Sequence, residues 1–234
     1  MTQEIIRLQN VHKDYPMGDV IVRALDGVST SINKGDFVAI IGPNGAGKSV
    51  LLRTLLGLLP YKGEVILEPG IIIGYAPQRF VLERDLPISA NEWLQLSGVS
   101  KEMIAETLKK VGFAPSLLNQ PIGILSSGQL QRLILAFALL RKPKILFVDE
   151  PLSAVDASGS EAITQLLLKL SKEEGIAILF VSHDLNLVNR SASHIICLNR
   201  KQVCFGGTKE ALSEKTLKEL FGEDQTVYQH QHQE

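Results

Sequence analysis

Short strand-like runs alternate with turns in the N-terminal part of the chain. The runs Ile5–Val11, Val20–Leu25 and Val28–Ile32 predict antiparallel strands, and Met17-Gly18-Asp19 predicts a turn. The next run, Phe37–Ile41, is apolar at every position and ends at a glycine. Such a run is typical of a strand that is buried on both faces of a parallel sheet.

From Lys48 onward, the apolar residues recur at the spacing of a helix. Leucines lie on most faces of Lys48–Leu59, which predicts a helix that Pro60 ends. From about Ile88 to Leu140 the pattern is helical again and suits a small lobe. The helices that we expect in this lobe are Ala90–Leu96, Lys101–Val111 and Gly128–Leu140.

Two apolar, β-rich runs follow the expected lobe. Ile145–Val148 and Ile176–Val181 predict buried strands, and Gly159–Glu174 between them predicts an amphipathic helix. A strand, a helix and a strand at this spacing imply a parallel sheet. The tail from Gly222 onward is polar, and we expect it to be frayed or flexible.

Composition narrows the class of protein. A chain of 234 residues can bury the core of one large α/β domain, and its net charge of -1 gives no basic field for nucleic acid. The start, MTQEIIRLQN, does not resemble a signal peptide. The longest apolar run, Leu133–Leu140, is far shorter than the ~20 residues of a membrane-spanning helix, so any membrane role requires a partner. The only two cysteines, Cys197 and Cys204, lie in apolar strand-like runs, so we expect both to be buried thiols. Two cysteines give no disulfide framework, which fits a reducing compartment.

The segment GPNGAGKS has the spacing of a phosphate-binding loop between a strand and a helix. Its glycines let successive amides face one anion, Lys48 would reach the β- and γ-phosphates, and Ser49 would ligate Mg²⁺. The alternative is a glycine-rich turn without a ligand. Val50 replaces the usual threonine, at a cost of about 1 kcal/mol of binding. The nucleotide-binding residues expected here are Gly42, Pro43, Asn44, Gly45, Ala46, Gly47, Lys48, Ser49 and Val50.

Acidic residues follow the next buried strand. Asp149 and Glu150 come at the end of ILFVDE, where side chains project at the edge of a parallel sheet that binds nucleotide. We expect Asp149 to hold Mg²⁺ and Glu150 to polarise the attacking water. The alternative is a helix-capping Asp before a surface Glu. His183 ends the following strand and would contact the γ-phosphate, although a strand-end histidine can also be structural.

The chain resembles the nucleotide-binding subunit of an ATP-binding-cassette transporter. GPNGAGKS resembles the phosphate loop of that family, YAPQR its glutamine loop with Gln78, LSSGQ its signature, and ILFVDE its magnesium strand. SAVD (Ser153 to Asp156) resembles the dimer loop, His183 the switch histidine, and Tyr15 the aromatic residue that stacks on adenine. These motifs span Tyr15 to His183 in the order and spacing of the family.

This resemblance implies an α/β fold with ATP and Mg²⁺ as cofactors. The expected core is a RecA-like P-loop NTPase with a parallel sheet and an N-terminal antiparallel β subdomain, over residues 1–87 and 141–222. A helical signature subdomain would occupy residues 88–140, so that 1–222 form one ATPase domain and 223–234 a flexible tail. Ser49, Gln78 and Asp149 are the implied Mg²⁺ ligands, and Glu150 and His183 the implied catalytic residues.

The resemblance also implies a homodimer. In the family, each signature covers the γ-phosphate that the partner copy binds, which assigns this role to Ser126, Ser127, Gly128 and Gln129. Ser127 replaces the usual glycine and fits if its φ is negative. The alternative is an ordinary N-cap serine at Ser126. Ser153 and Asp156 would lie in the dimer contact. Phe80, Leu86 and Trp93 would line the groove for a permease helix, or else belong to the core.

The C-terminal part is similar to the ATPase subunit of bacterial high-affinity zinc importers. Ser182–Gly207 and Glu219–His232 carry this similarity, together with Ile73–Ser89. Manganese and iron importers are close relatives, and Asp19–Ile32 resembles lipoprotein-releasing or efflux cassettes, so these cargoes remain alternatives. The implied partners are an integral-membrane permease and, indirectly, an extracytoplasmic substrate-binding protein, at the cytoplasmic face of the bacterial inner membrane. Two tail histidines, His230 and His232, are too few for a closed zinc site.

Two other classes of function are less consistent with the chain. Cassette ATPases that act on DNA or ribosomes usually carry long insertions or two cassettes, which are absent from this sequence. A small-molecule kinase could share the phosphate loop, but the signature and dimer-loop motifs argue against it.

Overall fold

The computed structural model describes residues 3–78, 87–150 and 157–222. Within these residues the strands form one sheet in the order β4-β1-β2-β9-β8-β3-β7-β6-β5. The pairs among β8, β3, β7, β6 and β5 are parallel, whereas β1, β2 and β4 pair antiparallel. The strands are β1 (Glu4–Met17), β2 (Val20–Asn33), β3 (Phe37–Ile41), β4 (Lys62–Leu67), β5 (Ile73–Ala76), β6 (Ile145–Asp149), β7 (Ala177–Val181), β8 (His194–Asn199) and β9 (Lys201–Gly206).

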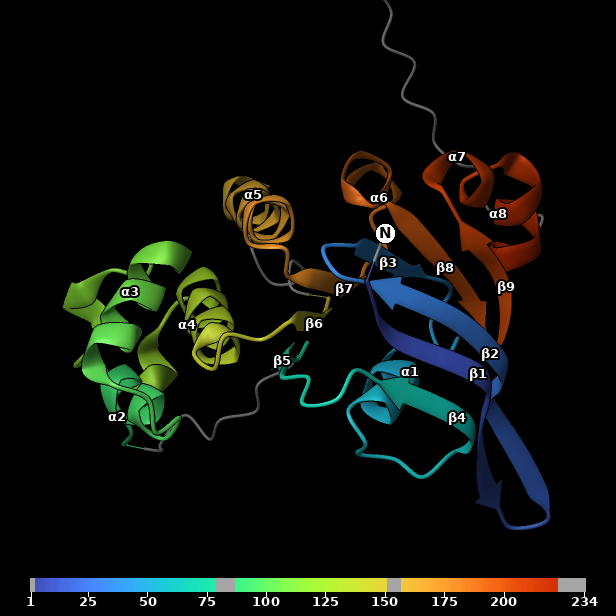
Figure 1. Ribbon diagram of the computed structural model, residues 1–234, viewed down its shortest axis with the longest axis horizontal. Coiled ribbons are helices and arrows are strands. Elements are labelled where there is room, and N and C mark those ends of the chain that lie inside the picture. The colour runs from blue at the N-terminus through green and yellow to red at the C-terminus, as the bar shows by residue number, and fades with distance from the viewer. Residues whose placement is uncertain (1–2, 79–86, 151–156, 223–234) are drawn as a thin grey trace, which may run out of the picture.

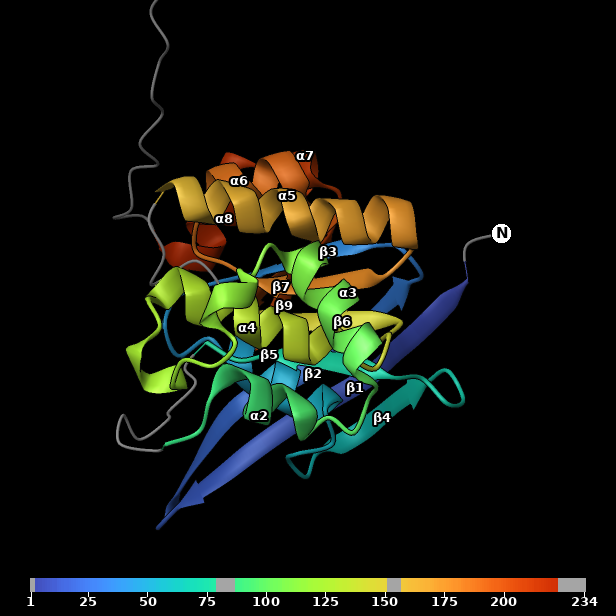
Figure 2. The same cartoon turned by 90° about the vertical axis from the view of Figure 1, so that its left-hand side faces the viewer.

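Helices form three groups around this sheet (Figures 1 and 2). One group lies beyond the β5 end of the sheet, where α4 packs against β5, and consists of α2 (Ala90–Gln95), α3 (Lys101–Val111) and α4 (Ser127–Leu139). The second group lies along one face, with α5 (Ala157–Glu174), α6 (Leu185–Ser191), α7 (Thr208–Ala211) and α8 (Glu214–Phe221). On the other side, α1 (Lys48–Leu55) lies beside β4 (Figure 1). Every helix within the described residues is too short or too polar to cross a membrane.

The central strand β3 is buried on both faces, as its apolar run predicts. Phe37, Ala39 and Ile41 face an apolar cluster that also contains side chains of α5 and of the α2–α4 group. Val38 and Ile40 face a second cluster, formed with α1, β1 and β2. Alternating side chains along an extended strand point to opposite faces, so a strand between two layers must be apolar throughout.

The N-terminal strands form the expected antiparallel subdomain. β1 and β2 join at Gly18-Asp19, where Gly18 has a φ of 63°, and Met17 pairs with Val20 across the turn. This confirms the predicted turn. The predicted break between Val20–Leu25 and Val28–Ile32 is wrong, because β2 continues through Gly27 with a register shift rather than a second turn. Gly27 has a left-handed φ of 75°, which allows the strand to change register without ending.

The helical group has clear start and stop signals. Ser89 and Glu92 form a capping box at α2, and Ser100 caps α3, which ends at Gly112 in the left-handed conformation. Trp93 is half-buried and stacks on Phe137 with ring centroids 4.5 Å apart, so it packs within the group. Of the other residues expected in a permease groove, Phe80 and Leu86 lie outside the described residues.

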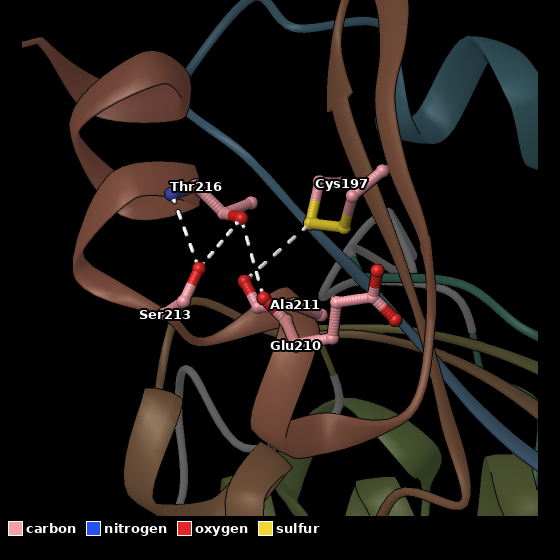
Figure 3. The surroundings of a disulfide bond; sticks show 6 residues. Cys197, Glu210, Ala211, Ser213 and Thr216 are labelled. Carbon is pink, nitrogen blue, oxygen red and sulfur yellow. Dashed lines mark hydrogen bonds between the residues drawn. A yellow bond between two sulfur atoms is a disulfide. The ribbon is translucent and has the colours of Figure 1, made fainter.

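Two further expectations need correction. The helix predicted over Lys48–Leu59 ends at Leu55, because Gly57 takes a left-handed φ of 71° and its N–H bonds to the carbonyl of Thr54 before Pro60 is reached. Cys197 and Cys204 are not free thiols. They occupy facing positions on β8 and β9 and form a disulfide, with Cα atoms 4.8 Å apart (Figure 3). Both cysteines lie in strand-like apolar runs, but nothing in the sequence indicates that these two runs pair and that the cysteines face each other.

Candidate functional site

The phosphate loop runs from Gly42 to the start of α1. Its conformation depends on close backbone approaches that only glycine permits. A Cβ at Gly42 would lie 1.9 Å from the Leu198 carbonyl oxygen, and one at Gly47 would lie 2.4 Å from the Ala24 carbonyl oxygen. Gly47 also has a φ of 97°, which side chains disfavour. Neighbouring strands therefore hold the loop at both of its ends.

Lys48 is held inside this loop. Its Nζ donates to the carbonyl oxygens of Gly42 at 2.8 Å and Pro43 at 3.0 Å. Burial lowers the pKa of Lys48 below its usual 10.5, while the negative charges of Glu150 and Asp149 act in the opposite direction. The ammonium group is thus kept at the N-terminus of α1, next to exposed amides that suit an anion.

Asp149 lies at the end of β6 and has the properties of a cation ligand. Burial is the main cause that raises its pKa above 3.8, and a hydrogen bond with Ser49 opposes that shift. Among the described residues, Asp149 Oδ1 is buried without a hydrogen-bond partner. An unpartnered buried carboxylate oxygen beside a hydroxyl fits the oxygen ligands that Mg²⁺ prefers. The residues present therefore fit a magnesium ion.

Gln78 and Glu150 meet across the same site. Gln78 Nε2 donates to Glu150 Oε2 at 2.6 Å, which leaves the amide oxygen of Gln78 as an acceptor. Glu150 has a left-handed φ of 45°, and its N–H bonds to the Val181 carbonyl at 3.2 Å. Both side chains line a cleft of ≈ 390 Å³ together with Lys48 and Ser49. The structure thus brings together the predicted glutamine loop, phosphate loop and acidic strand end.

Two other expected nucleotide contacts, His183 and Tyr15, have different surroundings. His183 is exposed just after β7, the strand adjacent to β6. Tyr15 is half-buried on β1 opposite Val22, and Lys13 Nζ lies 4.7 Å from the centre of its ring. Further along β2, Ala24 lines the cleft, as do Asn44, Gly45, Ala46 and Val50 of the loop region. The roles of His183 and Tyr15 stay predictions.

The signature segment begins α4. Ser126 is the N-cap: its Oγ accepts the Gln129 N–H at 3.3 Å, and its own N–H donates to Gln129 Oε1 at 2.9 Å. Ser127 is the first helical residue and has no positive φ, so serine fits this position without backbone strain. Ser127 and Gly128 carry first-turn N–H groups that have no partner within the helix. Ser126 therefore acts as the helix cap, as the alternative interpretation expects, while the N–H groups of Ser127 and Gly128 remain available to bind an anion.

Sequence reasoning missed two residues beside Asp149. Arg53 on α1 is close enough to Tyr75 on β5 and to Asp149 for its positive charge to favour the ionised form of each. Burial and the charge of Asp149 raise the pKa of Tyr75. Helical spacing could have indicated Arg53, because it lies four residues after Ser49 and so on the same helix face. Tyr75 belongs to the YAPQR segment that identified Gln78.

Ser153 and Asp156 of the expected dimer loop lie outside the described residues, as do His230 and His232.

A family model described as "ABC transporter" matches residues 25–153, which is more than half of the chain. The chain belongs to the ABC transporter family. It is an ATPase of that family, and its α/β fold is that of the ATP-binding cassettes.

Similar proteins include the Zinc import ATP-binding protein ZnuC of Pseudomonas aeruginosa (strain UCBPP-PA14). It is 42% identical over 213 residues, which cover 89% of this chain and 79% of that protein. ZnuC of Yersinia enterocolitica is 41% identical, with 90% and 85% covered. The dimeric post-hydrolysis structure of the cassette MJ0796 bound to ADP and Pi has a TM-score of 0.78 and 31% identity, with 87% and 99% covered. The cbiO1 structure from Clostridium perfringens has a TM-score of 0.75 and 26% identity, with 93% and 94% covered.

Asp149→Asn is expected to stabilise the nucleotide-free cassette at neutral pH. The folded protein keeps the Asp149 proton to a higher pH than the unfolded chain does, because the pKa is raised in the folded state. The carboxylate therefore reduces stability as the pH rises from about 4 to above the folded-state pKa. The amide removes this effect and should raise Tm by about 2–4 °C at neutral pH. Calorimetry at pH 4 and pH 7 checks this, and an equal Tm for both proteins at neutral pH would contradict it.

Proposed function

We propose that this chain is the ATP-hydrolysing subunit of an importer for a divalent metal ion, and that the ion is zinc. The observation that carries the ATPase part is the single cleft in which Lys48 and Ser49 of the phosphate loop face Gln78 and Glu150. The cargo is supported by the ZnuC relatives, which are about two-fifths identical over most of the chain. The C-terminal segments Ser182–Gly207 and Glu219–His232 carry the same similarity.

Binding begins at the phosphate loop. The backbone amides from Asn44 to Ser49 surround the β-phosphate, and Lys48 exchanges its two carbonyl acceptors for phosphate oxygens. Tyr15 stacks on the adenine ring, and the backbone of Val50 keeps the amide contact that the usual threonine also makes. A magnesium ion held by Ser49, Asp149 and Gln78 would neutralise charge across the phosphates.

Hydrolysis needs a positioned water molecule. Glu150 is the base that orients and polarises this water, and Gln78 fixes the carboxylate through its 2.6 Å hydrogen bond. His183 contacts the γ-phosphate from the end of the adjacent strand. The positive charge of Arg53 stabilises ionised Asp149 and so favours the form that binds a metal.

The active unit is a homodimer. Ser126, Ser127, Gly128 and Gln129 contact the γ-phosphate that the partner copy binds. Figure 1 supports this arrangement, because α4 and α1 lie on different sides of β5 and β6. Ser126 Oγ already accepts one hydrogen bond, so its hydroxyl proton is what it offers to phosphate. Ser153 and Asp156 complete the contact between the copies.

The domain division follows the same proposal. Residues 1–87 and 141–222 form the nucleotide-binding core, residues 88–140 form the helical unit that carries the signature, and residues 223–234 form a tail. Closure of the dimer on ATP and its opening after hydrolysis drive a separate membrane permease. That permease receives zinc from an extracytoplasmic binding protein, and the ATPase works at the cytoplasmic face of the membrane without contacting nucleic acid.

Growth under metal limitation tests the cargo. A deletion strain should fail in chelated, zinc-poor medium, and the intact chain should restore growth while Glu150→Gln does not. Added Zn²⁺ alone should rescue the deletion strain. Normal growth of the deletion strain in that medium would refute zinc import, and rescue by Mn²⁺ or Fe²⁺ alone would transfer the proposal to those metals.

A further inference from the structure

The turn between β8 and β9 forms one wall of the phosphate loop. The carbonyl oxygen of Leu198 lies so close to Gly42 that a Cβ atom on Gly42 would be only 1.9 Å from it. Two residues later, the N–H of Arg200 donates to the carbonyl oxygen of Ala46 at 2.8 Å. The turn therefore contacts the loop near its beginning and near its end. A change in the conformation of the turn would therefore move the backbone of the loop that binds phosphate.

A covalent bond closes the base of this turn. Cys197 and Cys204 face each other across β8 and β9 and form a disulfide with a sequence separation of 7. Leu198 and Arg200, which make the contacts with the loop, both lie inside the closed segment. The ladder also changes register between Cys197 and Leu198, so backbone pairing is irregular beside the disulfide. The covalent bond thus constrains the turn at the point where the hydrogen-bonded ladder does so least.

The surroundings of the two sulfur atoms suit an oxidised and a reduced state. Cys197 is buried, and Cys204 is half-buried and packs against the same apolar core, so Cys204 is the more accessible of the two residues. Figure 3 shows Cys197 directed toward the C-terminal helices, where the Ala211 carbonyl oxygen lies 3.8 Å from Cys197 Sγ. A disulfide has no proton to donate there, whereas a thiol does. The buried sulfur would therefore have a hydrogen-bond acceptor after reduction.

We propose that Cys197 and Cys204 form a reversible redox site that adjusts how tightly the phosphate loop binds nucleotide. The oxidant is a low-molecular-weight disulfide of the glutathione type. The Cys204 thiolate attacks one sulfur of this reagent and releases one glutathione. Cys197 then loses its proton and displaces the second glutathione from Cys204 Sγ. One disulfide is made in the protein and one is broken in the reagent, so two electrons pass to the two glutathione molecules released.

The oxidised form is the one that binds nucleotide more tightly. The disulfide restricts the segment that presses on Gly42 and holds Ala46, so less backbone freedom is lost when phosphate binds. After reduction the turn is held only by hydrogen bonds and packing, and more ordering must accompany binding. The inference rests on the nucleotide site proposed above. Because coupling between two sites is reciprocal, nucleotide must favour the disulfide by the same factor by which the disulfide favours nucleotide.

Nucleotide binding to the full chain in glutathione buffers tests the proposal. The probe is a fluorescent ATP analogue, and alkylation followed by mass measurement counts the thiols. The chain has only two cysteines, so the count reports this pair alone. We expect the Kd to rise roughly fivefold on reduction, at the low end of measured couplings between sites. Saturating nucleotide should shift the thiol–disulfide equilibrium constant toward the disulfide by the same factor.

Cys204→Ser is the matched control. It should keep the Kd of the reduced protein in every buffer, which excludes a direct effect of glutathione on the loop. Failure of the wild-type chain to form the disulfide under excess oxidised glutathione would overturn the proposal. Equal Kd values for the oxidised and reduced wild-type chain would also overturn it, and would leave the nucleotide site intact. Loss of nucleotide binding in both states would instead remove the nucleotide site and this inference together.

Discussion

Glu150→Gln is expected to bind ATP and to lower kcat by about 10²- to 10⁴-fold, which is the range for loss of a general base. The substitution keeps the size of the side chain and removes the charge that polarises water. Glu150 is held by Gln78 Nε2 at 2.6 Å, and an amide oxygen can accept the same hydrogen bond. Binding geometry should therefore persist while chemistry stops. Phosphate release under saturating ATP measures the fall in kcat, and titration with a fluorescent ATP analogue measures the retained binding.

Glu173→Gln is the matched control for this variant. Glu173 lies on α5, its side chain is 63% exposed, and it pairs only loosely with Lys169 at 3.8 Å. A surface pair of this kind contributes little, so kcat should equal that of the wild type. The Glu150 variant should also accumulate as ATP-bound dimers, visible as a doubled mass in size-exclusion light scattering. Turnover within a factor of two of the wild type would remove Glu150 as the base.

Gly42→Ala is expected to abolish nucleotide binding and to lower Tm. The new methyl group would lie 1.9 Å from the Leu198 carbonyl oxygen and 3.2 Å from Ala46 Cβ. Backbone cannot yield as a flexible side chain does, so the loop or β8 must move. We expect a rise in Kd of about 100-fold or more, because displaced amides lose several phosphate hydrogen bonds at once. Tm should fall by several degrees, roughly 4–10 °C, as for a severe backbone clash in a chain of this length.

Gly207→Ala provides the comparison for this second variant. A Cβ at Gly207 meets no heavy atom within 4 Å, and its φ is -66°. Alanine at this position should leave Kd unchanged and lower Tm only slightly, because Gly207 is the N-cap of the short helix α7 and alanine is a weaker cap. If Gly42→Ala bound nucleotide with wild-type affinity, the close contact between the loop and β8 would have no part in shaping the site.

Strands buried on both faces are the elements that the sequence predicts best. Phe37–Ile41 matches β3, and Ile145–Val148 falls one residue short of the end of β6, because an apolar layer on each side leaves no position for a polar residue. β4 was not predicted, since most of its side chains are exposed and no periodic pattern marks it. β8 and β9 were not assigned as a pair either, and the disulfide between them was missed for that reason.

The residues of the candidate site also fall into those that the sequence predicts and those that only the structure reveals. Local motifs located the phosphate loop, Gln78, Asp149 and Glu150, because each depends on a short segment with a fixed spacing. Sequence spacing cannot show which distant segments support these motifs. Tyr75 and the carbonyl of Leu198 reach the site through neighbouring strands of the sheet, and only the strand order reveals them. Roles that require a second copy of the chain, such as that of Ser126, remain predictions.

The position of β3 in the sheet also determines when the phosphate loop can form during synthesis. β3 lies between β7 and β8, which come from residues 177–181 and 194–199. The strand that leads into Gly42 therefore has neither of its hydrogen-bonding neighbours until most of the chain has left the ribosome. The antiparallel strands β1, β2 and β4 lie within residues 4–67 and can pair much earlier. The nascent cassette thus acquires its β subdomain first and its capacity to hold ATP among its last steps.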